Sequence, residues 1–209
     1  HDITVNKNIF ILANSTAGGN AANTIIDAQK LNRIFNVTSG ITFAIDNLTL
    51  KDGVAMNGGG IYSGYVANIT ITSSTFNNCS ASNSGGAIHY TLDTIAITSS
   101  TFNNCSAPYS GAIAANSGPA TISSSTFNNC SASNNGGSIG AYNSTITISS
   151  SKFSGCSAAY GGAIYSNKCN ATISSTSLSN CSATSGSAIY YYSSSTIHTH
   201  FSRIFSTTG

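Results

Sequence analysis

Residues 76–88 have the sequence FNNCSASNSGGAI, and the chain returns to this phrase at a nearly constant interval. The later copies are FNNCSAPYSGAI (102–113), FNNCSASNNGGSI (127–139), FSGCSAAYGGAI (153–164) and LSNCSATSGSAI (178–189). Their cysteines follow one another at 26, 25, 26 and 25 residues: Cys79, Cys105, Cys130, Cys156 and Cys181. A constant period of this length indicates a solenoid, in which each repeat buries its apolar face against its neighbours.

Each period contains two segments with the composition of short β-strands. The first, ITITSSTF at 69–76, alternates so that Ile71 points inward and its Thr and Ser neighbours point outward. The second is the GGAI segment, whose buried member is Ile88, and the Gly85-Gly86 pair before it permits a tight corner. No sustained 3.6-residue period predicts a helix.

Stacked parallel strands align the equivalent residues of successive coils into interior rows about 4.8 Å apart. One row is aromatic and contains Phe76, Phe102, Phe127 and Phe153, followed by Leu178. Another is aliphatic and contains Ile61, Ile88, Ile113, Ile139, Ile164 and Ile189. The sequence therefore predicts an all-β fold, a parallel β-helix of about eight coils with about 25 residues each.

The period weakens toward both ends of the chain. Residues 1–40 are expected to form an N-terminal cap with irregular first coils, 41–189 the regular repeats, and 190–209 a last coil with an open C-terminal end. The segment LKDGVAMNGGGI keeps the phase, with Leu50 in the Phe position and Gly53 in the Cys position.

The phrase F-x-x-C-x-A-x-x-x-G-G-A-I resembles the paired FxxN and GGA(I/L/V) repeats of the polymorphic outer-membrane-protein family, over about residues 41–189. Members of that family are right-handed parallel β-helical surface proteins, commonly adhesins. The resemblance therefore implies a right-handed coil and an adhesin-like role. One difference is systematic, because Cys stands where that family usually has Asn.

The composition narrows the classes of partner. Only 12 of the 209 residues are charged and the formal net charge is +2, which argues against nucleic acid and anionic membrane surfaces as partners. No apolar run approaches 18 residues, so no membrane span is expected. The chain starts at His1, and we interpret it as a processed or excised segment of a secreted, extracellular or cell-surface protein.

Several interpretations of the cysteines stay open. The row Cys79 to Cys181 could be buried thiols that act as small hydrophobic side chains, or one or two inter-coil disulfides could form at the spacing of about 4.8 Å. Cys169 is out of phase, aligned with Ser144, and is either a lone thiol or a partner for another chain. No CxxC motif occurs, so we expect no metal and no cofactor.

Three sets of outward residues are candidate functional sites. Tyr62, Tyr165 and Tyr190 directly follow the Ile of GGAI-type segments, where His89 also falls, and they could bind glycans by stacking. The Thr and Ser rows of the first strand, one of which was aligned to end at Thr196, are similar to the TxT faces of ice-binding solenoids. N-x-S/T sequons make six asparagines candidates for glycosylation: Asn78, Asn104, Asn129, Asn143, Asn170 and Asn180.

Catalysis has little support in the sequence, and no catalytic residue is predicted. Polysaccharide lyases and hydrolases need clustered carboxylates, and the chain has five Asp and no Glu. Asp27 and Asp52, 25 residues apart and close to Lys51 and Arg33, mark the one place where such a site could exist.

The leading prediction is a non-enzymatic extracellular or cell-surface β-helix, either an adhesin-like stalk or a self-assembling fibre subunit. Its expected partners are other copies of itself, joined end to end, or further domains of the same chain. The alternatives are a glycan-binding module, an ice-binding module, and an enzyme that resembles polysaccharide lyases or hydrolases.

Overall fold

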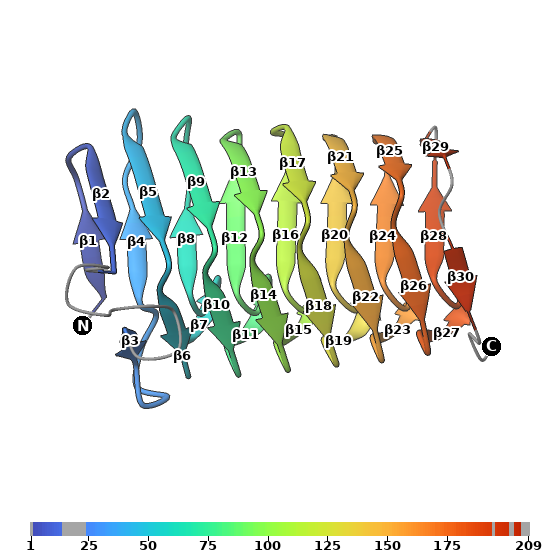
Figure 1. Ribbon diagram of the computed structural model, residues 1–209, viewed down its shortest axis with the longest axis horizontal. Helices are drawn as coiled ribbons and strands as arrows, with labels where there is room; N and C mark the ends of the chain where they lie inside the picture. The colour runs from blue at the N-terminus through green and yellow to red at the C-terminus, as the bar shows by residue number, and fades with distance from the viewer. Residues whose placement is uncertain (1, 14–23, 194, 201–202, 206–209) are drawn as a thin grey trace.

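The computed structural model describes residues 2–13, 24–193, 195–200 and 203–205. Within these ranges all the helices and strands are strands, which wind into a rod of stacked coils (Figure 1). Neighbouring strands pair in parallel, each with the equivalent strands one coil before and one coil after it. In these ranges no helix is long and apolar enough to cross a membrane.

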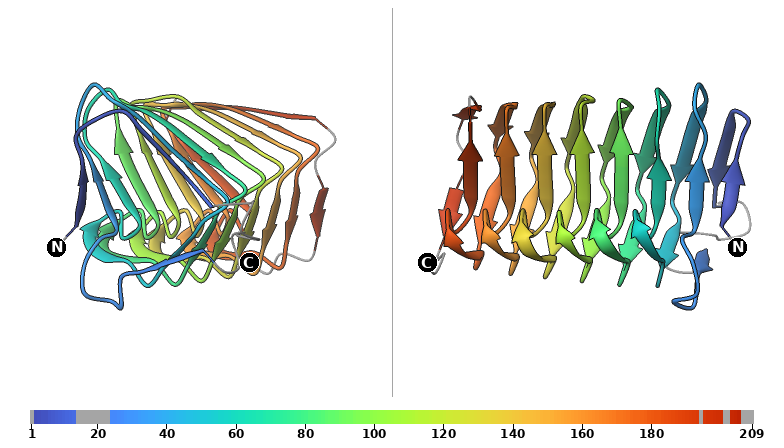
Figure 2. Two further views of the ribbon diagram at one scale, coloured as in Figure 1. Left: turned by 60° about the vertical axis from the view of Figure 1, so that its left-hand side comes forward. Right: turned by 180° about the vertical axis from the view of Figure 1, so that it is seen from behind.

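The strands form four sheets that run side by side along the rod (Figure 2). Sheet A contains β1 (Ile3–Val5), β4 (Phe35–Val37), β8 (Ile61–Ser63), β12 (Ile88–Thr91), β16 (Ile113–Asn116), β20 (Ile139–Tyr142), β24 (Ile164–Asn167) and β28 (Ile189–Tyr192). Sheet B contains β2 (Ile9–Leu12), β5 (Thr42–Asp46), β9 (Asn68–Thr72), β13 (Thr94–Thr98), β17 (Ala120–Ser123), β21 (Thr145–Ser149), β25 (Asn170–Ser174) and β29 (Thr196–His200). Sheet C contains β3 (Ile25–Asp27), β6 (Thr49–Lys51), β10 (Thr75–Asn77), β14 (Thr101–Asn103), β18 (Thr126–Asn128), β22 (Lys152–Ser154), β26 (Ser177–Ser179) and β30 (Arg203–Phe205). Sheet D contains β7 (Val54–Asn57), β11 (Ser80–Ser84), β15 (Ser106–Tyr109), β19 (Ser131–Asn135), β23 (Ser157–Tyr160) and β27 (Ser182–Ser185).

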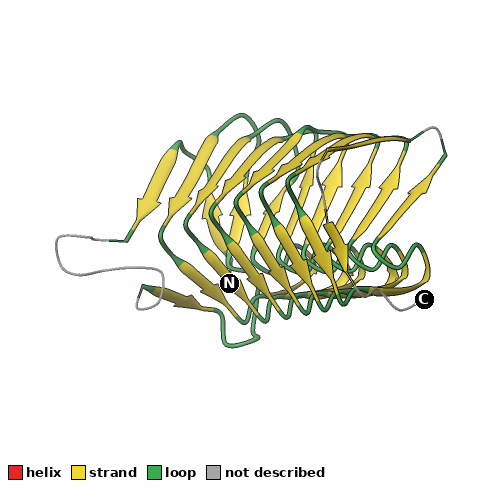
Figure 3. Cartoon of the chain, turned by 45° about the vertical axis from the view of Figure 1, so that its right-hand side comes forward, coloured by secondary structure: helices red, strands yellow, loops and turns green. Residues whose placement is uncertain are grey.

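Each coil passes through the sheets in the order A, B, C, D, and short loops join the strands of the regular coils (Figure 3). The six coils from β4–β7 to β24–β27 have all four strands, whereas β1–β3 and β28–β30 form three-strand coils at the two ends of the described chain. This architecture confirms the predicted all-β parallel β-helix of about eight coils. The segment 24–37 contributes the last strand of one coil and the first strand of the next, rather than an irregular coil of its own.

The sequence predicts one strand across residues 69–76, and here the structure differs. The chain turns at Ser73, whose φ is +46°, and the segment is divided between β9 and β10. The buried Ser74 hydroxyl donates to the Thr72 carbonyl at 2.7 Å, and the Ser74 N–H donates to Ser100 Oγ of the next coil at 3.1 Å. The single-strand prediction was wrong because consecutive serines supply the left-handed residue and the buried hydroxyl that a corner needs.

The core is a set of rows that run the length of the rod. Phe76, Phe102, Phe127 and Phe153 are fully buried and stack with ring centroids 4.8, 4.7 and 4.6 Å apart and nearly parallel planes. Leu50 and Leu178 continue the same row at its two ends. Because each ring contacts the equivalent ring of the next coil, the stack holds successive coils in register.

The corner between sheets D and A requires glycine for two separate reasons. The first residue of each pair has a left-handed φ, as at Gly136 (+64°). The second residue lies against the next coil, and a Cβ on Gly137 would overlap the backbone carbonyl of Gly162. The glycine pairs therefore permit the turn and also the close approach of successive coils.

Candidate functional site

The three tyrosines that the sequence singles out lie in one outward-facing column of sheet A. Tyr62 stacks on His89 with ring centroids 5.5 Å apart, and Tyr165 stacks on Tyr190 at 5.8 Å. Between these two stacks the column has only its two smallest side chains. From one end to the other, the column contains Tyr62, His89, Ala114, Gly140, Tyr165 and Tyr190.

The absence of a side chain at Gly140 has a cause in the neighbouring corner. Ser110 replaces the first corner glycine and keeps its left-handed φ, at +59°. A Cβ on Gly140 would overlap the Ser110 hydroxyl oxygen. Glycine at position 140 therefore makes room for serine at position 110, and it leaves the middle of the column low.

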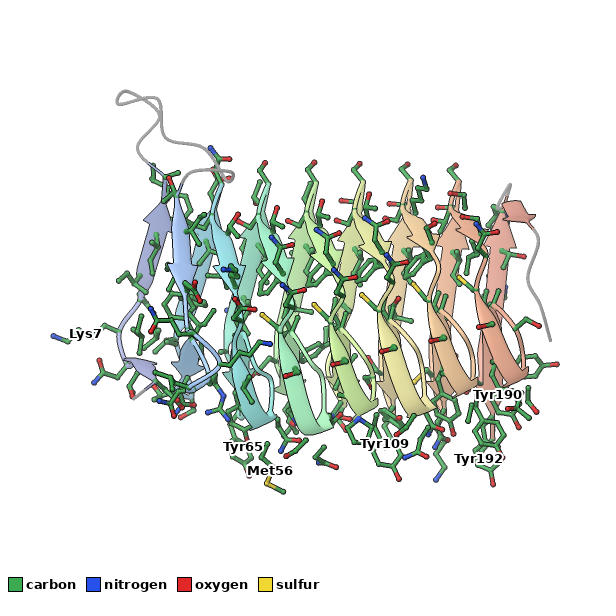
Figure 4. All side chains as sticks on the ribbon, turned by 90° about the horizontal axis from the view of Figure 1, so that it is seen from below. Lys7, Met56, Tyr65, Tyr109, Tyr190 and Tyr192 are labelled. Atoms are coloured by element: carbon green, nitrogen blue, oxygen red, sulfur yellow. The ribbon has the colours of Figure 1, made fainter. Side chains whose placement is uncertain are left out.

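Two ladders of larger side chains flank this column, so the column becomes the floor of a groove. The wall on sheet A contains Asn116, Tyr142, Asn167 and Tyr192. The wall on sheet D contains Ser84, Tyr109, Asn135, Tyr160 and Ser185. We call the surface made by the column and its two walls the A–D groove; Figure 4 shows Tyr109, Tyr190 and Tyr192 along one long side of the rod.

Two adjoining hollows lie along the A–D groove. The larger, of about 290 Å³, is lined by Asn83, Ser84, His89, Tyr109, Asn116, Asn135 and Tyr142. The smaller, of about 180 Å³, is lined by Asn135, Tyr160, Tyr165, Tyr190 and Tyr192. Asn135 borders both hollows, so they form one continuous depression lined by aromatic rings and amides.

The hollows of the A–D groove have no charged side chain among their lining residues. Burial, with a smaller contribution from nearby Arg33, lowers the pKa of His89 to about 4, so its imidazole is neutral at pH 7. Burial also raises the pKa of Tyr142, and it raises that of Tyr165 to about 12. Hydrogen bonding within the groove is sparse and long, with Asn135 Nδ2 donating to the Tyr142 hydroxyl at 3.4 Å.

The predicted tyrosines differ in how much of the ring they expose. Tyr165 is only 7% exposed and supports its neighbours, whereas Tyr109 and Tyr160 are 41% and 43% exposed. The fully buried Tyr90, also considered from the sequence as a surface ring, donates instead to the Gly118 carbonyl at 3.3 Å. Sequence reasoning missed Asn116 and Asn135, although their register with Tyr142 and Tyr109 could have identified them.

The charged cluster near the N-terminus consists of surface ion pairs. Lys51 Nζ lies 3.2 Å from Asp27 Oδ2 and 3.1 Å from Asp52 Oδ2. The backbone N–H of Gln29 and the Lys51 ammonium lower the pKa of Asp27, and the two carboxylates raise the pKa of Lys51. Among the residues that the structure describes, no three His, Cys, Asp or Glu side chains converge to hold a metal ion.

All six cysteines are buried and free. The five in the row lie at the corner between sheets C and D, where Cys79 Sγ donates to the Asn77 carbonyl at 3.7 Å, as Ser74 does at its own corner. Burial raises the pKa of Cys79 to about 12. Cys169 lies at the corner between sheets A and B, where its thiol accepts from the Ser144 N–H at 3.3 Å.

The six candidate glycosylation sites, Asn78, Asn104, Asn129, Asn143, Asn170 and Asn180, are all exposed. Four of them occupy the same corner, and Asn104 Nδ2 donates to Asn78 Oδ1 of the preceding coil at 3.4 Å. Neighbouring coils are therefore too close for bulky glycans on every rung of that corner.

The Thr and Ser rows lie on the outward face of sheet B. Thr70, Ala96, Thr121, Thr147 and Thr172 follow one another in register, as the sequence predicts. The next residue of the row is His198 rather than Thr196, which pairs with Asn170. The prediction for Thr196 was wrong because the last coil is longer by one residue before β29. Interruptions by Ala96 and His198 weaken the resemblance to an ice-binding face.

The chain matches the family model described as "Right handed beta helix region" over residues 33–204. No curated protein and no solved structure is similar enough to the chain to count as a match. The matched region covers most of the chain and includes both walls of the A–D groove. The protein therefore belongs to the right-handed β-helix family.

Proposed function

We propose that the protein is a non-enzymatic, adhesin-like β-helix of the cell exterior, which binds glycans in its A–D groove. The observation that carries this proposal is a continuous depression lined by tyrosines and asparagines, without charged groups. Aromatic rings present flat apolar faces for the C–H faces of sugars, and amides supply both donors and acceptors for hydroxyl groups. The repeat resemblance to the polymorphic outer-membrane-protein family supports the same role.

The positions of the carboxylates support a function without catalysis. Asp27 and Asp52 are held by Lys51, and Asp2 pairs with Arg33 at 2.9 Å. Glycoside hydrolysis requires two carboxyl groups that flank one scissile bond. None of these residues lines the A–D groove, so we propose that a bound glycan is retained intact.

Removal of an exposed groove tyrosine is expected to weaken glycan binding. Tyr109→Ala and Tyr142→Ala should each lower the affinity for oligosaccharides selected on a glycan array by about three- to tenfold, because a stacked ring is lost. Isothermal titration calorimetry measures the change.

Tyr65→Ala is the matched control, because Tyr65 is 64% exposed and lines neither hollow of the groove. Its affinity should equal that of the parent protein. Equal binding by all three variants, or absence of binding to any glycan, would contradict the proposal. Release of shortened or unsaturated sugars would contradict its non-enzymatic part.

We also propose that the rod associates end to end. Ile3 and Ile9 point inward in the first coil but are 48% and 45% exposed, whereas their partners Phe35 and Phe43 in the next coil are buried. A second copy, or a further domain of the same chain, would cover these side chains and pair with the open strand edges.

End-to-end association should depend on this apolar surface. Sedimentation velocity is expected to show oligomers that grow with protein concentration, and electron microscopy is expected to show linear rods. An Ile3→Lys/Ile9→Lys variant should stay monomeric. A parent protein that stays monomeric over the whole concentration range would exclude self-assembly of this segment.

A further inference from the structure

We propose that the ligand of the A–D groove is an extended, uncharged, β-linked polysaccharide that lies parallel to the axis of the rod, with successive sugars facing opposite walls. This inference deepens the proposed glycan-binding function and rests on it.

The first argument is the arrangement of side chains across the groove. The chain passes directly from a strand of sheet D to the next strand of sheet A, so two such strands form one rung of the groove. In the rung of β15 and β16, Tyr109 on the sheet D wall faces Asn116 on the sheet A wall. In the next rung the two side-chain types change places, because Asn135 is on sheet D and Tyr142 is on sheet A.

The exchange continues along the groove. Tyr160 and Asn167 form the following rung in the first arrangement, and Ser185 and Tyr192 form the next in the second. The parallel register links all four rungs on both walls. Aromatic rings therefore alternate between the two walls from rung to rung.

This alternation matches the symmetry of one class of polymer. In an extended β-1,4-linked chain, each pyranose is rotated by about half a turn relative to its neighbour, so consecutive sugars direct the same face to opposite sides. A chain in the A–D groove would then meet a tyrosine on alternate sides and an amide or hydroxyl across from it. A helical α-linked chain does not have this twofold alternation.

The spacing of the rungs agrees with the same assignment. Tyrosines recur on one wall every second rung, as Tyr109 and Tyr160 do on sheet D and Tyr142 and Tyr192 do on sheet A. At about 4.8 Å per rung this repeat is about 10 Å. The repeat of an extended β-1,4-linked chain is two sugars and has a similar length.

The electrostatics select an uncharged polymer. Both hollows are lined by neutral side chains, and no lysine or arginine among those linings could pair with uronate or sulfate groups. Arg33 lies at one end of the floor column, 4.8 Å from the centre of the Tyr62 ring, and its guanidinium already donates to Asp2 and to backbone carbonyls.

The test compares hexasaccharides of equal length by isothermal titration calorimetry on the whole chain. At least one of cellohexaose, chitohexaose and β-1,4-mannohexaose is expected to bind at least tenfold more tightly than maltohexaose, whose α-1,4 linkages favour a helix. Affinity for that β-1,4 series should rise by at least tenfold from the disaccharide to the hexasaccharide. The double variant Tyr109→Ala/Tyr142→Ala, which removes one ring from each wall, should flatten this dependence on length.

Two other results would overturn the inference in distinguishable ways. If maltohexaose binds as tightly as the β-1,4 hexasaccharides, or if disaccharides bind as tightly as hexasaccharides, the extended ligand is wrong while glycan binding remains. Tighter binding of oligomannuronate than of mannohexaose would refute the uncharged ligand. If no sugar on an array binds, the proposed function itself fails.

Discussion

Replacement of Gly137 by alanine is expected to lower the free energy of unfolding by at least about 3 kcal/mol. The cause is steric, because the new Cβ would overlap the Gly162 carbonyl and crowd the Ser157 backbone of the next coil. Backbone atoms cannot rotate away as a side chain can, so two coils would have to separate. That separation would also disturb hydrogen bonds such as Gly137 N–H to the Gly161 carbonyl, at 3.1 Å.

Ser187 supplies the control for this variant. It occupies the position equivalent to Gly137 and Gly162, but no strand of sheet D follows β27 in the described part of the chain. Ser187→Ala should therefore change the unfolding midpoint little. Urea unfolding followed by far-ultraviolet circular dichroism measures both variants, and equal midpoints for Gly137→Ala and the parent would refute the steric account.

Replacement of Phe127 by alanine is the second large effect, with an expected loss of about 3–5 kcal/mol. Its ring lies between Phe102 and Phe153, at centroid distances of 4.7 and 4.6 Å. The truncation removes buried apolar area, leaves a cavity and interrupts the stack between two coils. In a solenoid such a break weakens the interface between neighbouring coils, which is what holds the rod together.

Leucine is the matched replacement at this position. Leu50 and Leu178 already occupy the same row, so Phe127→Leu should fit the interior and cost about 1 kcal/mol. Thermal and urea unfolding of the two variants test the difference. A loss of the same size for leucine and alanine would show that volume alone does not set the stability of the row.

The interior of the rod could be predicted from the sequence because the period determines which residues stack. Once Phe76 and Phe102 have the same phase, parallel pairing aligns them without further information. The break of residues 69–76 at Ser73 was missed, since alternating Thr and Ser continue a strand pattern through the corner. Only the left-handed φ at Ser73 and the buried Ser74 hydroxyl reveal the turn.

The A–D groove was only partly predictable. Tyr62, Tyr165 and Tyr190 share one phase and were therefore found together. Tyr109 and Asn116 belong to different sheets, and their juxtaposition depends on how sharply the chain bends at Ser110 and Gly111. Sequence period alone does not specify that angle.

A crystal structure of the protein with a bound β-1,4-linked hexasaccharide tests the central claim most directly. The account predicts a sugar chain parallel to the rod axis in the A–D groove, with one ring against Tyr109 and the next against Tyr142 on the opposite wall. A sugar chain bound on another face, or one lying across the rungs, would contradict it.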